Sequence, residues 1–324
     1  MDLQITHETR YDYEPAVEVA QHICHLQPIH NATQGLVAHA LEISPPPADI
    51  SRALDTYGNT RCFFSLHTSH DHLLMVAKSL IATTAPATAQ SSLAWEQVRD
   101  RFRYSAGQTY DAAAEFVFAS PHVPRHAEFA AFARPSFVPH IPLLQATKDL
   151  MLRIHTEFVY ESQSTQVNTP ALEALAQRKG VCQDFAHIMI ACLRALGLPA
   201  RYVSGYLLTE PPPGEARLVG SDASHAWVSV YIPDLPTSLK WCDFDPTNNR
   251  FGLGSPGEDY VTLALGRDYA DVSPVRGVIQ GGTHHTLAVA VTVEPVSLPS
   301  PGQTQWQHQS QGQSQCQFQG QLLN

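Results

Sequence analysis

The chain has 324 residues, of which 44% are hydrophobic, and a formal net charge of −10 at pH 7. Its length favours two structural units, and its negative charge disfavours binding to nucleic acid or to an anionic membrane. The sequence contains no run of lysine and arginine and no stretch of about 18 apolar residues, so we expect neither a nucleic-acid partner nor a membrane partner.

The cysteines and histidines limit the redox compartment and the cofactors. Six cysteines are scattered along the sequence, and the N-terminus lacks the basic and apolar segments of a secretory signal. We therefore expect reduced thiols and a cytoplasmic location. The 17 histidines are not accompanied by an HExxH motif or a CxxC pair, so the sequence predicts no metal site and no cofactor.

The first part of the chain, residues 1–85, has the pattern of an antiparallel β-module. Leu3 and Ile5 alternate with polar neighbours, and residues 55–59 (DTYGN) form a turn signal before another apolar run. Residues 86–140 are predicted to be a linker with connecting helices, because small residues and prolines interrupt short helix-compatible segments.

The segment 141–296 is predicted to be a mixed unit of helices and strands that carries the chemistry. Apolar residues recur at threes and fours over residues 142–160, and Pro170 begins a second, shorter helix. Residues 285–296 alternate again and are expected to form the last strand of this unit. The remaining residues, 297–324, are rich in glutamine and are predicted to be a disordered tail.

One helical stripe in this unit begins after Gly180. Its apolar positions are Phe185, Ile188, Met189, Cys192, Leu193 and Leu196. Gly197 and Pro199 form a stop signal. The helix is therefore predicted to cover residues 182–196, with Cys182 in its first turn.

Cys182 is the candidate nucleophile because of this position. A helix N-terminus has unpaired N–H groups and a partial positive charge, which favour a thiolate and can stabilise an oxyanion. Asp184 in the same turn is expected to stabilise the helix start rather than to act in catalysis. Cys192 lies on the apolar stripe and Cys242 lies in a strand, so both are expected to be structural. A buried, unreactive cysteine is the alternative for Cys182.

His225 is the candidate base, and Asp245 is the candidate acid that orients it. His225 opens a predicted strand over residues 225–232, and Asp245 ends the next strand, 239–249. A buried carboxylate beside the imidazole would fix its tautomer and stabilise the imidazolium. Thiol, imidazole and carboxylate in this arrangement are what acyl transfer from an amide needs.

Two other residues are weaker candidates for these roles. Asp243 shares a face with Asp245, but Asp245 lies at the strand end, in line with the start of the His225 strand. His187 follows Cys182 in the same helix, at about 140° around the helix axis. We therefore expect His187 not to be the base.

Three motifs in this part of the chain resemble the bacterial transglutaminase-like superfamily. They are residues 180–186 (GVCQDFA), 224–228 (SHAWV) and 244–248 (FDPTN), and residues 194–203 (RALGLPARYV) also match. Residues 5–13 (ITHETRYDY) resemble the β-module that precedes the core in the bacterial branch. The resemblance implies an α+β fold with a papain-like core, in which a nucleophile helix packs on an antiparallel sheet. It also implies a Cys-His-Asp triad at Cys182, His225 and Asp245.

Three functions are compatible with these residues. The first is a thiol protease or amidase, in which water resolves a thioester, and we favour it because water is always present. The second is a cross-linking transglutaminase, in which a lysine amine resolves the thioester. The third is a peptide-binding module without catalysis. In each case the expected partner is a peptide or protein.

Overall fold

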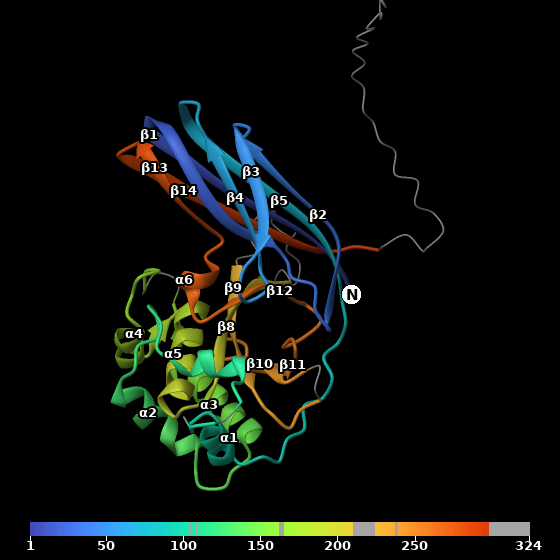
Figure 1. Ribbon diagram of the computed structural model, residues 1–324, viewed down its shortest axis with the longest axis vertical. Helices are drawn as coiled ribbons and strands as arrows, with labels where there is room; N and C mark the ends of the chain where they lie inside the picture. The colour runs from blue at the N-terminus through green and yellow to red at the C-terminus, as the bar shows by residue number, and fades with distance from the viewer. Residues whose placement is uncertain (104, 108, 162–164, 210–223, 237–238, 298–324) are drawn as a thin grey trace, which may run out of the picture.

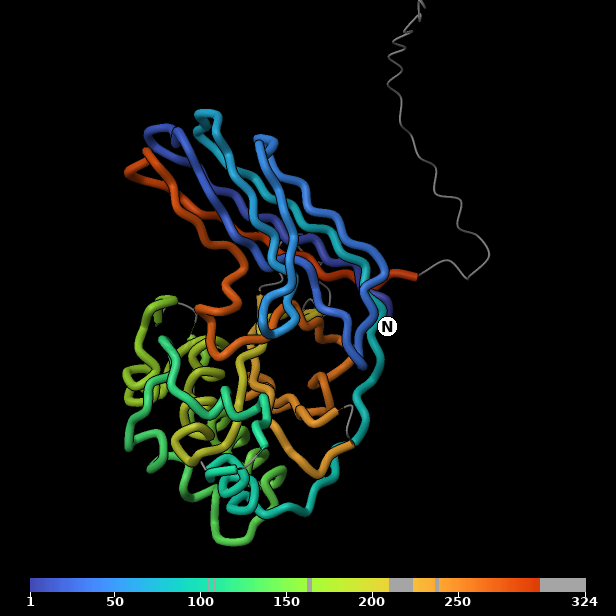
Figure 2. The backbone as a smooth tube through the Cα atoms, viewed as in Figure 1, coloured from blue at the N-terminus to red at the C-terminus, as the bar shows by residue number. Residues whose placement is uncertain are grey.

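The computed structural model describes residues 1–297 except 104, 108, 162–164, 210–223 and 237–238. Within these residues, a long twisted sheet stands on a mixed core of helices and a second sheet (Figure 1). The backbone trace shows the first and the last described strands together in the long sheet (Figure 2). The glutamine-rich segment from residue 298 onward lies outside the described residues.

The long sheet contains the antiparallel β-module that the sequence predicts. Its strands are β1 (Asp2–Gln27), β2 (Gln34–Ser44), β3 (Asp49–Leu54), β4 (Thr60–Leu66), β5 (His70–Thr83), β13 (Val275–Gly281) and β14 (His284–Pro295). β1 is the organising strand: its first half pairs with β5 and β14, and its second half pairs with β4 and β13. We call this whole sheet the β-module.

The C-terminal strand is placed differently from our expectation for residues 285–296. It does not join the sheet of the mixed core, because β14 pairs with β1 along its whole length. The physical reason is the shared burial of alternating apolar side chains. Val291 and Val293 pack in one cluster with Leu3 and Ile5.

The mixed core confirms the predicted α+β class. Its main helices are α1 (Trp95–Arg101), α2 (Ala127–Ala133), α3 (Leu143–Glu157), α4 (Ala171–Gln177) and α5 (Cys182–Ala195), with short helices η1 (Ala112–Val117), η2 (Arg134–Ser136) and α6 (Tyr269–Val272). Its sheet has the order β11 (Arg250–Leu253), β10 (Trp241–Asp245), β9 (Ser224–Tyr231), β8 (Ala200–Leu207) and β12 (Tyr260–Gly266). A separate parallel pair joins β6 (Val159–Tyr160) to β7 (Lys179–Gly180). All neighbours in the main sheet are antiparallel, and α5 packs against β8 and β9.

The predicted nucleophile helix is therefore α5, and its apolar stripe forms the centre of the core. Ile188, Met189 and Cys192 are fully buried in the largest apolar cluster. Cys242 is buried in the same cluster, so both Cys192 and Cys242 are structural, as predicted. Among the described residues, no helix combines the length and the apolar character needed to cross a membrane.

The β-module and the mixed core share one apolar cluster, to which both contribute side chains. It comprises Leu3, Ile5, Ile81, Val291 and Val293 from the β-module, and Tyr206, Val261 and Leu263 from the core. Burial of these side chains removes apolar surface from water on both sides of the contact. The two parts are thus joined by a common hydrophobic interior and not only by the linker.

Two side-chain amides of the β-module complete the hydrogen bonding of the edge strand β12. The amide of Gln34 donates to the carbonyl of Thr262 and accepts from its N–H, both at 2.7 Å. The amide of Asn59 donates to the carbonyl of Leu265 at 2.7 Å and accepts from its N–H at 2.8 Å. Each amide thus makes the pair of hydrogen bonds that a neighbouring strand would make with one residue of β12. These bonds satisfy the backbone N–H and carbonyl groups of Thr262 and Leu265 at the edge of the sheet.

We predict that Gln34→Ala and Asn59→Ala each lower the free energy of unfolding by about 1–3 kcal/mol, because each removes two hydrogen bonds to the backbone of β12 and leaves the N–H of Thr262 or of Leu265 without its side-chain acceptor. Urea unfolding measures this loss. Gln4→Ala is the control, since Gln4 is an exposed amide in the same module. A loss for the two buried amides no larger than for the control would contradict the role of this contact.

Candidate active site

Cys182 is the first residue of α5, and the helix start is built by a carboxylate and a glycine. Oδ2 of Asp184 accepts a hydrogen bond from the N–H of Val181 at 2.9 Å and from Thr165 Oγ1 at 2.6 Å. A side chain at Gly180 would place its Cβ 2.7 Å from the Cβ of Asp184. Glycine is therefore required where the chain passes the cap, and Asp184 acts as the stabiliser that the sequence predicts.

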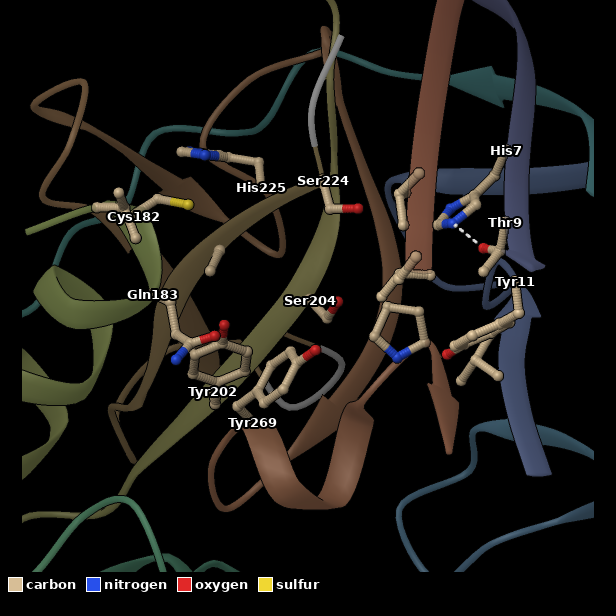
Figure 3. Close-up of a pocket in the computed structure, with 16 residues that line it drawn as sticks. His7, Thr9, Tyr11, Cys182, Gln183, Tyr202, Ser204, Ser224, His225 and Tyr269 are labelled. Carbon is tan, nitrogen blue, oxygen red and sulfur yellow. Dashed lines mark hydrogen bonds between the residues drawn. The ribbon is translucent and has the colours of Figure 1, made fainter. Parts of the chain in front are cut away.

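His225 lies on β9 and faces the thiol. Its Nε2 lies 2.7 Å from Oδ2 of Asp245, so Nδ1 is the ring nitrogen that is free to meet a thiol. The sulfur of Cys182 points toward the imidazole (Figure 3). The thiol is half-buried, the imidazole is 9% exposed and the carboxylate is fully buried.

Asp245 receives hydrogen bonds from several directions. Besides His225, its Oδ2 accepts from Asn248 Nδ2 at 2.7 Å and from the Tyr260 hydroxyl at 2.8 Å. Its Oδ1 accepts from the backbone N–H of Thr247 at 2.8 Å and of Asn248 at 3.3 Å. These bonds compensate the loss of water around the buried carboxylate.

Asn248 and Tyr260 are site residues that the sequence argument did not identify. Asn248 stands in the FDPTN segment, directly after the turn at Pro246, and this position was the available signal. Tyr260 comes from β12 on the opposite edge of the sheet, where no local pattern connects it to Asp245. Its ring packs edge-on against Trp227, with the ring centroids 5.4 Å apart.

The titration of His225 reflects these neighbours. Burial lowers its pKa, but the hydrogen bonds and charges of Asp245 and Cys182 outweigh burial and raise the pKa to about 10. Burial raises the pKa of Asp245, but bonding to His225, Asn248 and Tyr260 holds it below the ordinary value. The site therefore favours a protonated imidazole beside an ionised carboxylate.

Asp243 has a different partner. Its Oδ2 accepts a hydrogen bond from the indole N–H of Trp227 at 2.9 Å. Two separate side-chain pairs therefore join β9 to β10: His225 with Asp245, and Trp227 with Asp243. Burial raises the pKa of Asp243. The structure thus brings Asp245, and not Asp243, to the imidazole.

His187 has partners other than the thiol. Its Nε2 accepts a hydrogen bond from the backbone N–H of Tyr269 at 3.2 Å, and its ring stacks on His122 with centroids 5.3 Å apart. Burial lowers the pKa of His187 to about 3. It is a neutral, buried acceptor in the core.

Cys182 and His225 open onto a cavity of about 270 Å³. Core residues on one side include Tyr202, Ser204 and Tyr269, and β-module residues on the other include His7, Thr9 and Tyr11 (Figure 3). We call this space the active-site cavity. Within the described residues, no group of three or more His, Cys, Asp or Glu side chains is placed to hold a metal ion.

The chain is similar to known proteins over most of its length. The sequence matches the bacterial transglutaminase-like N-terminal region over residues 3–82 and the transglutaminase-like superfamily over residues 136–246. A solved structure from Cytophaga hutchinsonii, described as a candidate cysteine protease, has the same fold. Its TM-score is 0.67 at 21% identity, and the match covers 92% of each chain.

Curated relatives match nearly the whole chain. An uncharacterised protein of Mycobacterium tuberculosis is 39% identical over 298 residues, which are 90% of this chain and 92% of that protein. One from Mycobacterium leprae is 30% identical over 308 residues, covering 90% and 98%. A protein-glutamine gamma-glutamyltransferase of Pseudomonas aeruginosa is 41% identical over only 71 residues, or 22% of this chain and 10% of that protein. The chain therefore belongs to the transglutaminase-like superfamily, in the bacterial group that carries this N-terminal region.

Proposed function

We propose that the protein is a cysteine-dependent enzyme that hydrolyses amide or peptide bonds in a peptide or protein. The observation that carries the proposal is the meeting of three groups at the active-site cavity: Cys182 faces His225, and His225 bonds to buried Asp245. In this proposal Cys182 is the nucleophile, His225 transfers the proton and Asp245 orients the imidazole.

The first half-reaction forms a thioester. The Cys182 thiolate attacks the amide carbonyl carbon, and the carbonyl oxygen becomes an oxyanion near the free N–H groups at the start of α5. The His225 imidazolium then gives its proton to the departing nitrogen, so that the C–N bond breaks and an amine or ammonia leaves. Asp245 keeps the ring oriented during this transfer.

The second half-reaction regenerates the Cys182 thiolate and the His225 imidazolium. The imidazole, now neutral, takes a proton from water, and the water oxygen attacks the thioester carbonyl. The C–S bond breaks, and a carboxylic acid leaves. We favour water as the acceptor because it needs no binding site of its own, whereas an amine would have to be held and water excluded. A reducing cytoplasm, which we propose as the location, would keep Cys182 as a thiol.

Amine transfer is the second candidate function. The similarity of a 71-residue segment to a protein-glutamine gamma-glutamyltransferase supports it. The thioester would be the same, but a lysine amine would attack it in place of water.

We predict that Cys182→Ala lowers amide cleavage by at least about 10³-fold, because no other group in the site can form the thioester. Release of an anilide from short peptide substrates measures the rate. Cys62→Ala is the control, since Cys62 is a free cysteine of the β-module outside the cavity lining. Unchanged cleavage in Cys182→Ala would exclude the proposal.

We predict that a glutamine-containing peptide is hydrolysed faster than it is joined to an amine. Mass spectrometry would follow cleavage and deamidation in the absence and presence of a primary amine at millimolar concentration. Incorporation of the amine at a higher rate than hydrolysis would reverse the order of the two candidate functions. Cys182→Ala is the blank for both products.

We predict that kcat/KM falls as the pH rises through about 10, because His225 loses its proton there and cannot protonate the leaving amine. In Asp245→Asn the groups that raise the pKa are weakened while burial remains, so this fall should move to lower pH by more than about one pH unit. Activity should also drop by about 10²–10⁴-fold.

Asp243→Asn is the matched control for the pH profile. It neutralises a buried carboxylate on the same strand that bonds to Trp227 and not to His225. In Asp243→Asn, the fall of kcat/KM at alkaline pH should occur at the same pH as in the wild-type protein. If the pH at which kcat/KM falls changes in Asp243→Asn but not in Asp245→Asn, the assignment of Asp245 is refuted.

A further inference from the structure

The β-module supplies one wall of the active-site cavity. On β1 the cavity is lined by His7, Thr9 and Tyr11, which alternate along the strand and therefore share one face. On β14 it is lined by Leu287 and Val289. Two segments that are far apart in the sequence, β1 and β14, thus line the same side of the cavity that contains Cys182.

The register of the two strands makes these side chains one continuous surface. Tyr11 lies opposite Leu287, and Thr9 lies opposite Val289, in the antiparallel ladder of β1 and β14. Residues directly opposite each other in such a ladder project from the same face of the sheet. We call these four side chains, together with His7, the β-module wall.

The β-module wall is fixed to the core. Nδ1 of His7 lies 2.9 Å from the Tyr206 hydroxyl, and its Nε2 lies 3.1 Å from Thr9 Oγ1. His7, Thr9 and Tyr206 are each at most 2% exposed. Tyr206 belongs to β8 and lies opposite Ser224, the neighbour of His225. The contact with Tyr206 thus fixes the position of the β-module wall relative to β9, the strand that carries His225.

Apart from the Cys182–His225 pair, the lining of the cavity carries no ionised side chain. Burial lowers the pKa of His7 to about 4, so this imidazole is neutral at pH 7. The described lining consists otherwise of aliphatic, aromatic, hydroxyl and amide side chains, the Cys182–His225 pair and one proline, with no Asp, Glu, Lys or Arg among them. Leu287 and Val289 are 53% and 52% exposed, so this part of the lining offers a substrate side chain an accessible apolar surface without a counter-charge for a charged group.

The size of the cavity limits what can enter. About 270 Å³ lies just below the range of roughly 300–1,000 Å³ that is usual for ligand pockets. It suits one large side chain or a short extended segment next to the reacting amide. Tyr11, Tyr202 and Tyr269 border it with ring faces and edges that favour apolar and aromatic groups.

We propose that the β-module wall, through Leu287, Val289 and Tyr11, is the specificity-determining surface of the enzyme and selects an uncharged apolar or aromatic substrate side chain beside the reacting amide. This inference rests on the proposed function for its meaning in catalysis. The β-module is then part of the active site and not an appended domain.

The test uses the peptides acetyl-X-Gln-X-amide, with X as Leu, Phe, Glu or Lys. We expect binding to full-length Cys182→Ala protein to be at least tenfold tighter for Leu and Phe than for Glu and Lys. Adding Val289→Asp should weaken binding of the Leu and Phe peptides at least tenfold and should strengthen binding of the Lys peptide. Leu287→Asp is a second, independent variant with the same expectation. Equal binding of all four peptides, or no change of preference in both variants, overturns the inference.

Val278→Asp is the matched control. Val278 is a valine of the same β-module, on β13, that is 77% exposed and does not line the cavity. It should leave the peptide preference unchanged, and thermal unfolding should show that all three Asp variants are folded. A control that changes the preference as much as Val289→Asp overturns the inference.

The same panel with an intact Cys182 separates the two proposals. A preference in binding without any turnover by the wild-type protein defeats the proposed function and leaves the wall as a binding surface. If the protein turns over the peptides but Val289→Asp changes kcat/KM for the Leu and Lys peptides by the same factor, the specificity assignment is wrong and the proposed function stands. The expected result is turnover with a Leu-to-Lys ratio that falls at least tenfold in Val289→Asp.

Discussion

A buried negative charge is the constraint on which the arrangement of this protein depends. Asp245 has no exposed surface, so its carboxylate is stable only when donors surround it. Those donors come from β9, from the turn after β10 and from β12, and they include His225, Asn248 and Tyr260. Three parts of the chain must therefore converge on one carboxylate, and the imidazole is oriented as part of that convergence.

Local signals were sufficient for the parts of the site that depend on one segment. Gly180 and the apolar spacing that follows it predict a helix starting at Cys182, and α5 starts there. The position of Asp245 at a strand end predicts its proximity to the start of the preceding strand, and its Oδ2 lies 2.7 Å from Nε2 of His225. These features follow from helix and strand periods, which a single sequence displays.

Contacts between distant segments were beyond the reach of the same patterns. Tyr260 lies in an apolar strand that is buried on both faces, and nothing in this local pattern shows which carboxylate its hydroxyl will meet. The alternation of residues 285–296 fits either sheet, and the choice of β1 as partner depends on burial beside Leu3 and Ile5. His7 looks like an ordinary strand histidine until β8 is placed beside it.

The pairing of β14 with β1 also has a consequence for synthesis of the protein. A ribosome makes the strand with Tyr11 early and the strand with Leu287 and Val289 only after the whole helical core. Until residue 289 has been added, the nascent chain can hold Cys182, His225 and Asp245 but lacks part of the surface beside them. Translation products that end before residue 289 therefore cannot contain the completed cavity, because its lining includes both early and late segments of the chain.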